Sequence, residues 1–357
     1  MNYFNQLNLI DSSFTNPDFE SLRIDQPYKS KNYKRVGNED LIGTKVNSSE
    51  NIEDIFWNTG ITNNPEVLPI FTNYNDQRIE CPNNKAILNT RTGKTISVVS
   101  NSYEMVKNDM ILKAIEPNLN FLDIEHVISM NNTARCFVIC AIKNNDLEVS
   151  KGDAIRRRLI FVNSFDGSYS FKVIQSDVRL WCFNQMGSIQ NTKNKMIFKH
   201  QKGINNYLEN LGEFISYQRD DLSNSIEEFK AMKNTKCSSE ILKELFLYSF
   251  EDKLKGQITD KETKEKRNKK FSDIENEFLK IKEFYNIESG SNEPNLYNAF
   301  NAITQYETHE ESSRIDKTES ARIRFESLIR GRNGERILKA RQKALSLTRE
   351  HKIKFNF

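Results

Sequence analysis

Hydrophobic and polar residues follow two different periods along this chain, and the change falls near residue 200. Before it, short runs rich in Val, Ile, Phe and Tyr alternate with turn residues, a pattern typical of β-strands. The clearest pair, 159–165 and 169–175, is joined by Asp166-Gly167-Ser168. Asp-Gly between apolar runs favours a hairpin because glycine adopts positive φ without steric cost. Further strands are predicted over 79–88, 95–99, 121–129 and 134–142, and helices around Ile55–Trp57 and over 102–115 and 178–188.

After Gly203 the apolar residues recur every three or four positions, which predicts amphipathic helices. The last of them is a long charged helix over 319–349, interrupted at 330–334. Strands followed by helices predict an α+β fold, with an antiparallel, strand-rich N-terminal half built on a β-β-β-α-like core and a helical C-terminal half that covers it. The predicted regions are an irregular N-terminal arm (1–50), a strand-rich α+β domain (51–200), a helical region (201–312) and a basic helical tail (313–357).

Composition narrows the class of protein. The chain has 357 residues, of which 37% are hydrophobic, and this suffices for a substantial core. No run approaches the ~20 apolar residues that span a bilayer, and the N-terminus does not resemble a secretion signal. The five cysteines lack metal-type spacing and are interpreted as reduced thiols. We therefore expect a cytoplasmic protein without a metal or another cofactor.

Charge is unevenly distributed. The net charge is +3, but residues 314–357 contain thirteen Lys and Arg against five Asp and Glu, a net of +8. The preceding residues therefore carry 3 − 8 = −5. A basic tail on a slightly acidic body indicates an anionic partner, most simply nucleic acid. The alternative is a solvated helix face.

One segment places several polar side chains among large apolar ones. In Asp177-Val-Arg-Leu-Trp-Cys-Phe-Asn184, residues Arg179, Cys182 and Asn184 must find partners or a ligand. Cys182 with His200 and His309 would supply a nucleophile and a base, which is the enzyme hypothesis for this chain. No nucleophile elbow, metal motif or phosphate-binding loop accompanies them.

Basic and aromatic residues are interleaved in the same part of the chain, which favours single-strand binding by base stacking and backbone neutralisation. The alternative is that the aromatic residues form the buried face of a sheet. The candidate nucleic-acid-binding residues are Arg156, Arg157, Arg158, Lys172, Arg179, Trp181 and Lys199.

Several separated motifs resemble a widespread family of phage- and plasmid-encoded proteins of uncharacterised domain type. The family pattern is a strand ending in a DGS turn, a VR-V-C-N segment, a basic residue before His, and a C-terminal N-A-x-T-x-Y-x-x-H helix. The resemblance covers roughly residues 50–312. The matching positions are Asp166, Gly167, Ser168, Val178, Arg179, Cys182, Asn184, Lys199, His200, Asn298 (or Asn301), Ala299, Thr304, Tyr306 and His309.

The predicted strands and helix also look like the β-β-β-α core of single-strand annealing proteins, an analogy of fold alone. We expect a homo-oligomeric protein that binds single-stranded DNA and assists annealing or recombination. The alternatives are the enzyme hypothesis and a protein-binding structural or anti-defence factor. A polar network is expected to meet around one cleft, formed by Arg179 with Asn184, His200, Asn298, Tyr306 and His309.

Overall fold

The computed structural model describes most of the chain after residue 41. The described residues are 42–47, 51–62, 65–144, 146–179, 188–189, 195–204, 211–212, 215, 222–255, 264–289, 293–309 and 316–355. The irregular arm predicted over 1–50 lies largely outside these ranges, as do Trp181, Cys182 and Asn184.

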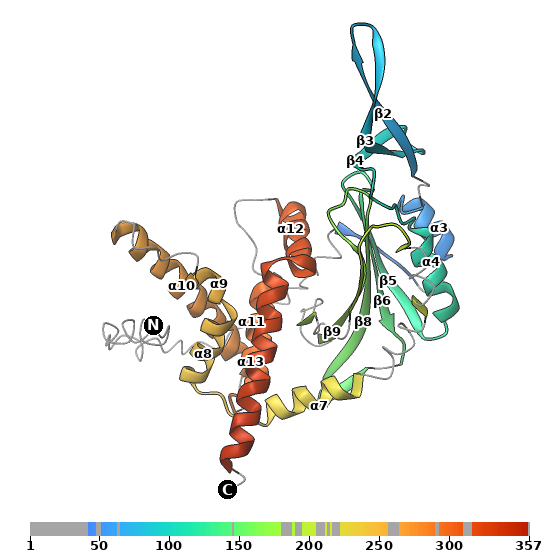
Figure 1. Ribbon diagram of the computed structural model, residues 1–357. Coiled ribbons are helices and arrows are strands. Elements are labelled where there is room, and N and C mark those ends of the chain that lie inside the picture. Colours follow the sequence, from blue (N-terminus) through green and yellow to red (C-terminus); the bar gives the residue numbers. More distant parts are fainter. Residues whose placement is uncertain are drawn as a thin grey trace. The chain divides into compact units, whose positions relative to one another are not determined.

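A large antiparallel sheet forms the centre of the strand-rich half (Figure 1). Its strands follow the order β1-β5-β6-β8-β9-β10, with β7 paired to β8 and β11 paired to β9. The hairpins predicted over 121–142 and 159–175 are confirmed as β5–β6 and β8–β9, and the α+β class is confirmed with them. The strands are β1 (Thr44–Lys45), β5 (Leu122–Met130), β6 (Arg135–Ile142), β7 (Leu147–Ser150), β8 (Asp153–Ser164), β9 (Phe171–Arg179), β10 (Ser188–Ile189) and β11 (Lys195–Phe198).

Two predicted helices need correction. The helix expected over 178–188 is wrong at both ends, since β9 continues to Arg179 and β10 contains Ser188. Asp177 lies opposite Arg157 in the β8–β9 ladder, and this cross-strand pair favours the strand. The helix expected over 102–115 begins only at Asp109, because Tyr103 is held by tertiary contacts described below.

A smaller sheet has three strands: β2 (Glu66–Tyr74), β3 (Gln77–Asn89) and β4 (Lys94–Ser100). This sheet is called the arm from here on, and it is distinct from the N-terminal segment 1–50. The predicted strands 79–88 and 95–99 are confirmed as parts of β3 and β4. Strand β2 was not predicted. The β2–β3 turn uses Asn75 and Asp76, both with positive φ (48° and 60°), the combination that suits a tight two-residue hairpin. The hairpin extends beyond the large sheet (Figure 1).

Helices pack against the large sheet through two hydrophobic clusters. One cluster joins β5, β6 and β8 to the C-terminal helices, with Phe137 packed edge-on against Phe325 at 5.0 Å. The other joins the sheet to α3 and α4 through residues such as Phe56 and Phe161. No helix in the described ranges is both long and apolar enough to cross a bilayer. The helices are α3 (Ile52–Asn58), α4 (Asp109–Ile115), the 3-10 helix η2 (Glu116–Asn118), α7 (Leu222–Lys233), α8 (Ser239–Ser249), α9 (Glu251–Lys255), α10 (Lys264–Ser289), α11 (Leu296–His309), α12 (Lys317–Arg330) and α13 (Arg332–Phe355).

Candidate nucleic-acid interface

The three consecutive arginines of β8 are engaged by carboxylates within the chain. Arg157 is 0% exposed, and its guanidinium binds Asp177 (2.9 Å) and Ser225 (2.9 Å). Arg158 forms an ion pair with Glu125, whose Oε2 lies 2.5 Å from the Nε of the arginine. Arg156 binds Glu125 at 3.2 Å and grips Asp146 with two bonds of 2.9 and 2.7 Å. Each of the three guanidinium groups is thus paired with a carboxylate of the same chain. Arg157 is not accessible to a ligand in solution.

The remaining predicted contact residues fall into two groups. Lys172 is half-buried on β9, where its ammonium donates to the carbonyl of Ile329 (3.4 Å). Lys199 is exposed directly after β11. Arg179 ends β9, but its side chain lies outside the described residues, together with all of Trp181.

The predicted polar network is divided between two places. The ring of His200 stacks on Tyr103 (centroids 4.7 Å apart), and its Nδ1 lies 3.0 Å from the carbonyl oxygen of Glu104. Burial lowers the pKa of His200, so the neutral ring is favoured. On α11, by contrast, Asn298 donates to Ser289 (3.3 Å). Tyr306 and His309 also belong to α11.

A cluster that we call the corner surrounds the DGS turn. Arg135 joins Asp166 of the turn (2.9 Å) to Glu326 of α12 (2.9 Å). Arg330, at the end of α12, donates to the carbonyl of Ser168 (2.7 Å). Burial works to raise the pKa of Asp166, but the bonds it accepts from Ser168 and Arg135 hold that pKa below its ordinary value. The corner therefore fastens the turn to the C-terminal helices.

Tyr169 lies at the centre of the corner. Its ring is approached by the charged groups of Arg330 (4.6 Å from the centroid), Lys172 (5.3 Å) and Arg135 (5.9 Å). Burial raises the pKa of Tyr169 to about 12, so its hydroxyl stays protonated. Arg332, the first residue of α13, is exposed two positions after Arg330.

The arm is fixed to the same end of the sheet. Tyr103 donates its hydroxyl to the carbonyl of Ser164 (2.6 Å), and Ser97 of β4 donates to the carbonyl of Phe165. Asn89 of β3 donates to Thr133 in the β5–β6 turn (3.2 Å). The DGS turn and His200 thus lie at the base of the arm.

Three aromatic side chains on and beside the arm remain in solvent: Trp57 (51% exposed), Phe71 (37%) and Tyr74 (66%). The guanidinium of Arg78 lies over Phe71 at 3.8 Å from the ring centroid. That of Arg91 lies over Trp57 at 4.7 Å and donates to the carbonyl of the same residue (2.6 Å). Exposed aromatic faces beside cations are the surface that stacks unpaired bases.

Sequence reasoning missed these residues. Trp57 was predicted to lie in a helix and also fits the N-terminal half of the family pattern, but it was not predicted to contact nucleic acid. Phe71 and Tyr74 belong to a strand that was not predicted. The sequence does contain a local indication of this hairpin. Asn75 and Asp76 follow Tyr74 and precede a run that contains apolar residues, and such residues are typical of a hairpin turn. Which aromatic residues stay exposed depends on tertiary packing, and the sequence pattern does not report it.

Several cations of the basic tail pair with carboxylates of the preceding helices. Arg336 of α13 binds Asp252 at 2.7 Å, and Arg341 binds Glu228 at 2.6 Å. Lys343 binds Glu244 at 2.6 Å. Part of the excess positive charge of the tail is thus paired within the chain, between α13 and the helices it contacts.

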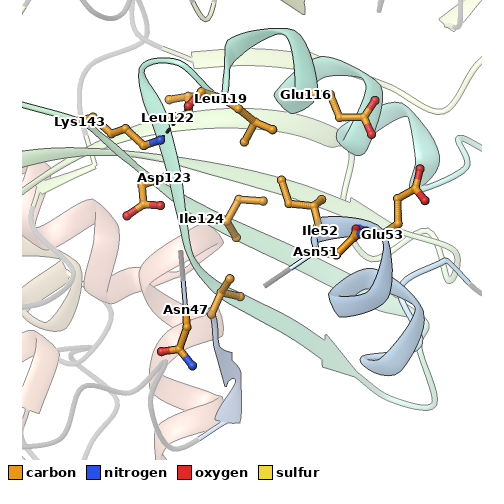
Figure 2. A pocket seen from close by; sticks show the side chains of 11 residues that line it. Asn47, Asn51, Ile52, Glu53, Glu116, Leu119, Leu122, Asp123, Ile124 and Lys143 are labelled. Carbon is orange, nitrogen blue, oxygen red and sulfur yellow. Dashed lines mark hydrogen bonds between the residues drawn. The ribbon is translucent and has the colours of Figure 1, made fainter. Parts of the chain in front are cut away.

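A cleft of about 510 Å³ lies beside the start of β5 (Figure 2). Glu53, Glu116 and Asp123 line it, and its one lysine, Lys143, donates to the carbonyl of Leu119 (2.8 Å). Three carboxylates against one ammonium make this cleft unfavourable for a polyanion. It also lies at the end of the β5–β6 hairpin away from Thr133 and the arm.

Residues 95–329 match the family described as Domain of unknown function (DUF932), and the chain belongs to this family. The match begins in β4 and ends in α12, so it excludes the β2–β3 hairpin and reaches further into the tail than the 50–312 expected from motifs. No curated protein matches the chain significantly. No solved structure matches it either.

Proposed function

We propose that this protein binds single-stranded DNA along the arm and the corner, and that it assists strand annealing for a phage or another mobile element. The observation that carries the proposal is the set of solvent-exposed aromatic rings on and beside the arm, two of which lie under an arginine. Stacking on an aromatic ring contributes ~1–3 kcal/mol per base and tolerates any base sequence.

The arrangement favours unpaired over paired strands for a physical reason. Bases in a duplex already stack on one another, so their faces are closed to Trp57, Phe71 and Tyr74. Cations are available nearby for the phosphates, namely the exposed Lys94 of β4, Lys199 and Arg332. Arginine beside a ring also adds a cation–π contribution when a base stacks there.

Strand annealing is the part of the proposal that rests on analogy. The resemblance to the β-β-β-α core of annealing proteins and to mobile-element families supports it, and fold alone does not fix function. Two complementary strands must be held extended, with bases accessible, to anneal. An exposed stacking surface suits this task because it binds bases from one side only.

Binding is tested by fluorescence anisotropy with a labelled thirty-nucleotide oligothymidine and a duplex of equal length. We expect tighter binding of the single strand, and an affinity that falls linearly in log–log form as salt rises. The double variant Trp57→Ala/Tyr74→Ala should bind the single strand at least ~30-fold more weakly, because two lost stacking contacts at ~1–3 kcal/mol each sum to at least ~2 kcal/mol.

The matched control is Tyr248→Ala. Tyr248 is also exposed (44%) and also lies near a cation, with Lys343 at 5.9 Å, but it belongs to α8 in the helical half. The control should bind DNA as the unchanged protein does. Equal binding of single strand and duplex, or equal losses in the arm variant and the control, would refute the assignment. An annealing assay with two complementary labelled strands then tests the second part.

A further inference from the structure

The turn between α12 and α13, here called the junction, carries Arg330 and Arg332 on either side of a glycine. Both arginines are exposed, and neither forms an ion pair with a carboxylate among the residues that the structure describes. By contrast, Arg336 of the same helix α13 is buried and binds Asp252 at 2.7 Å. The two charges at the junction are therefore accessible to an anion from solution.

The backbone of the junction is held in one tight conformation. Gly331 has no room for a side chain, because a Cβ there would lie 2.9 Å from the Cα of Ser327. The hydroxyl of Ser327 donates to the side-chain oxygen of Asn333 (2.8 Å), and Asn333 donates to the carbonyl of Glu307 (2.9 Å). The segment that carries both arginines is thus ordered before any ligand binds, which lowers the entropic cost of binding.

The side chain of Arg330 is also held by the corner. Its Nη1 donates to the carbonyl of Ser168 (2.7 Å), and its guanidinium lies 4.6 Å from the centroid of the Tyr169 ring. A guanidinium has five N–H donors, so most of them remain for a ligand. The ammonium of Lys172 lies beside the same ring, at 5.3 Å.

The hydroxyl of Tyr169 is an unusual group in these surroundings. The residue is 3% exposed, and its hydroxyl has no hydrogen-bond partner among the described residues. A buried polar group without a partner costs ~1–3 kcal/mol, and such groups are normally satisfied by protein, water or a ligand. A hydroxyl of this kind among three cations indicates that an oxygen-rich anion completes the site.

The N-terminus of α13 adds to the positive field of the junction. The helix has 24 residues, and the N–H groups and dipole of its first turn attract anions. Arg332 occupies the first position, where a cation is unfavourable unless an anion compensates it. The acidic residue of this turn, Glu335, is exposed and forms no ion pair with Arg332 in the described structure.

We propose that the junction is a phosphate-binding site, in which Arg330 and Arg332 hold a phosphodiester of the DNA strand that stacks on the arm. Guanidinium suits this ligand because its planar N–H groups bind two phosphate oxygens at once. The junction and the arm meet at the same turn, since Arg330 donates to Ser168 and Ser97 of β4 donates to Phe165. The inference rests on the proposed function and divides the work: rings of the arm stack bases, and the junction neutralises the backbone.

The first test is the salt dependence of single-strand binding. Each phosphate contact contributes ~0.7 to the slope of log affinity against log salt concentration for a single strand. Arg330→Gln/Arg332→Gln should therefore lower the magnitude of the slope by about 1.4 and weaken binding roughly tenfold at physiological salt. Trp57→Ala/Tyr74→Ala should instead weaken binding at every salt concentration and leave the slope unchanged, because stacking releases no counterions. Circular dichroism checks that the variants are folded.

The matched control is Lys317→Gln/Arg349→Gln. It removes two exposed cations from the same two helices, but at the ends away from the junction. Lys317 and Arg330 are separated by the length of α12, ~20 Å at 1.5 Å per residue. The control should keep the slope of the unchanged protein. Equal reductions by the two double variants would overturn the proposal, because they would show that only net charge matters.

A second measurement does not need DNA. Millimolar inorganic pyrophosphate should raise the Tm of the unchanged protein above its value in sodium chloride of equal ionic strength, because a ligand of the folded state stabilises it. Arg330→Gln/Arg332→Gln should abolish this rise, and the control should keep it. Absence of the rise, or its persistence in the junction variant, would overturn the site. A rise that depends on the two arginines in a protein that binds no single strand would refute the proposed function, and would leave a phosphate site for a free phosphate compound.

Discussion

Arginine serves two opposite purposes in the sheet body and in the arm. In the body, Arg157 is buried and held by Asp177, and Arg135 joins Asp166 to Glu326. On the arm, Arg78 and Arg91 lie over aromatic rings in solvent. In the body the fold brings carboxylates to the guanidinium groups, whereas Arg78 and Arg91 lie over rings that are themselves exposed. The number of arginines in a segment therefore says little about which of them are available to a ligand.

The largest effect is expected from breaking a buried pair in the body. Arg157→Ala should lower the free energy of unfolding by ~3–5 kcal/mol, because it leaves Asp177 buried without its main partner. Arg341 lies 3.7 Å from the same carboxylate and would still pair with it. The loss of stability should therefore fall in the lower part of that range. Urea denaturation followed by circular dichroism measures the change.

The neighbouring Arg156→Ala is the matched control. The side chains of Arg156 and Asp146 are each 34% exposed, so their bonds are partly screened by water, and the expected loss is ~1 kcal/mol or less. Equal losses for the two variants would show that burial does not distinguish the two arginines.

A smaller, pH-dependent effect is expected at Glu307. Burial raises the pKa of Glu307 to about 7, against the opposing effect of Arg336 at 3.3 Å. Between its ordinary value of 4.5 and pH 7, the folded chain holds a proton that the unfolded chain has released. Stability from this group therefore falls as pH rises through this window, by up to about 3 kcal/mol, and is level above it.

Glu307→Gln removes this titration. The variant should lose less stability than the unchanged protein between pH 5 and pH 7.5, as measured by denaturant midpoints at each pH. Asp252→Asn, on the same arginine but with a lowered pKa, should not flatten the profile in this window. Parallel profiles for Glu307→Gln and the unchanged protein would contradict the expectation.

The smallest effect is expected on the arm. Phe71→Ala removes an exposed ring that packs on Arg78, so the free energy of global unfolding should change by less than ~0.5 kcal/mol. Hydrogen exchange should likewise be faster for amides at the tip of the arm than in β6, which is buried along most of its length. A cooperative loss of the whole fold on changing Phe71 would show that the arm is part of the core.

The strand pairs of the large sheet could be predicted because their signals are local. Gly167 has a φ of 70°, and its preference for a turn does not depend on contacts with distant parts of the chain. The partners of Arg156 and Arg157 could not be predicted, since Asp146 and Asp177 meet them only in a particular strand register. Strand β2 was not predicted because its residues are exposed on both faces of the sheet, so that apolar and polar residues do not alternate along it.

The last long helix has a consequence for how the chain reaches its folded state. Arg341 of α13 contacts Asp177, more than 160 residues earlier in the sequence, and Ala340 and Ala344 complete the core that the sheet began. Because the chain is synthesised from its N-terminus, the strands of the sheet leave the ribosome well before this helix does. Until then the part of the apolar face that α13 covers is exposed. We therefore expect closure of the core to be a late step that depends on contacts between distant parts of the sequence.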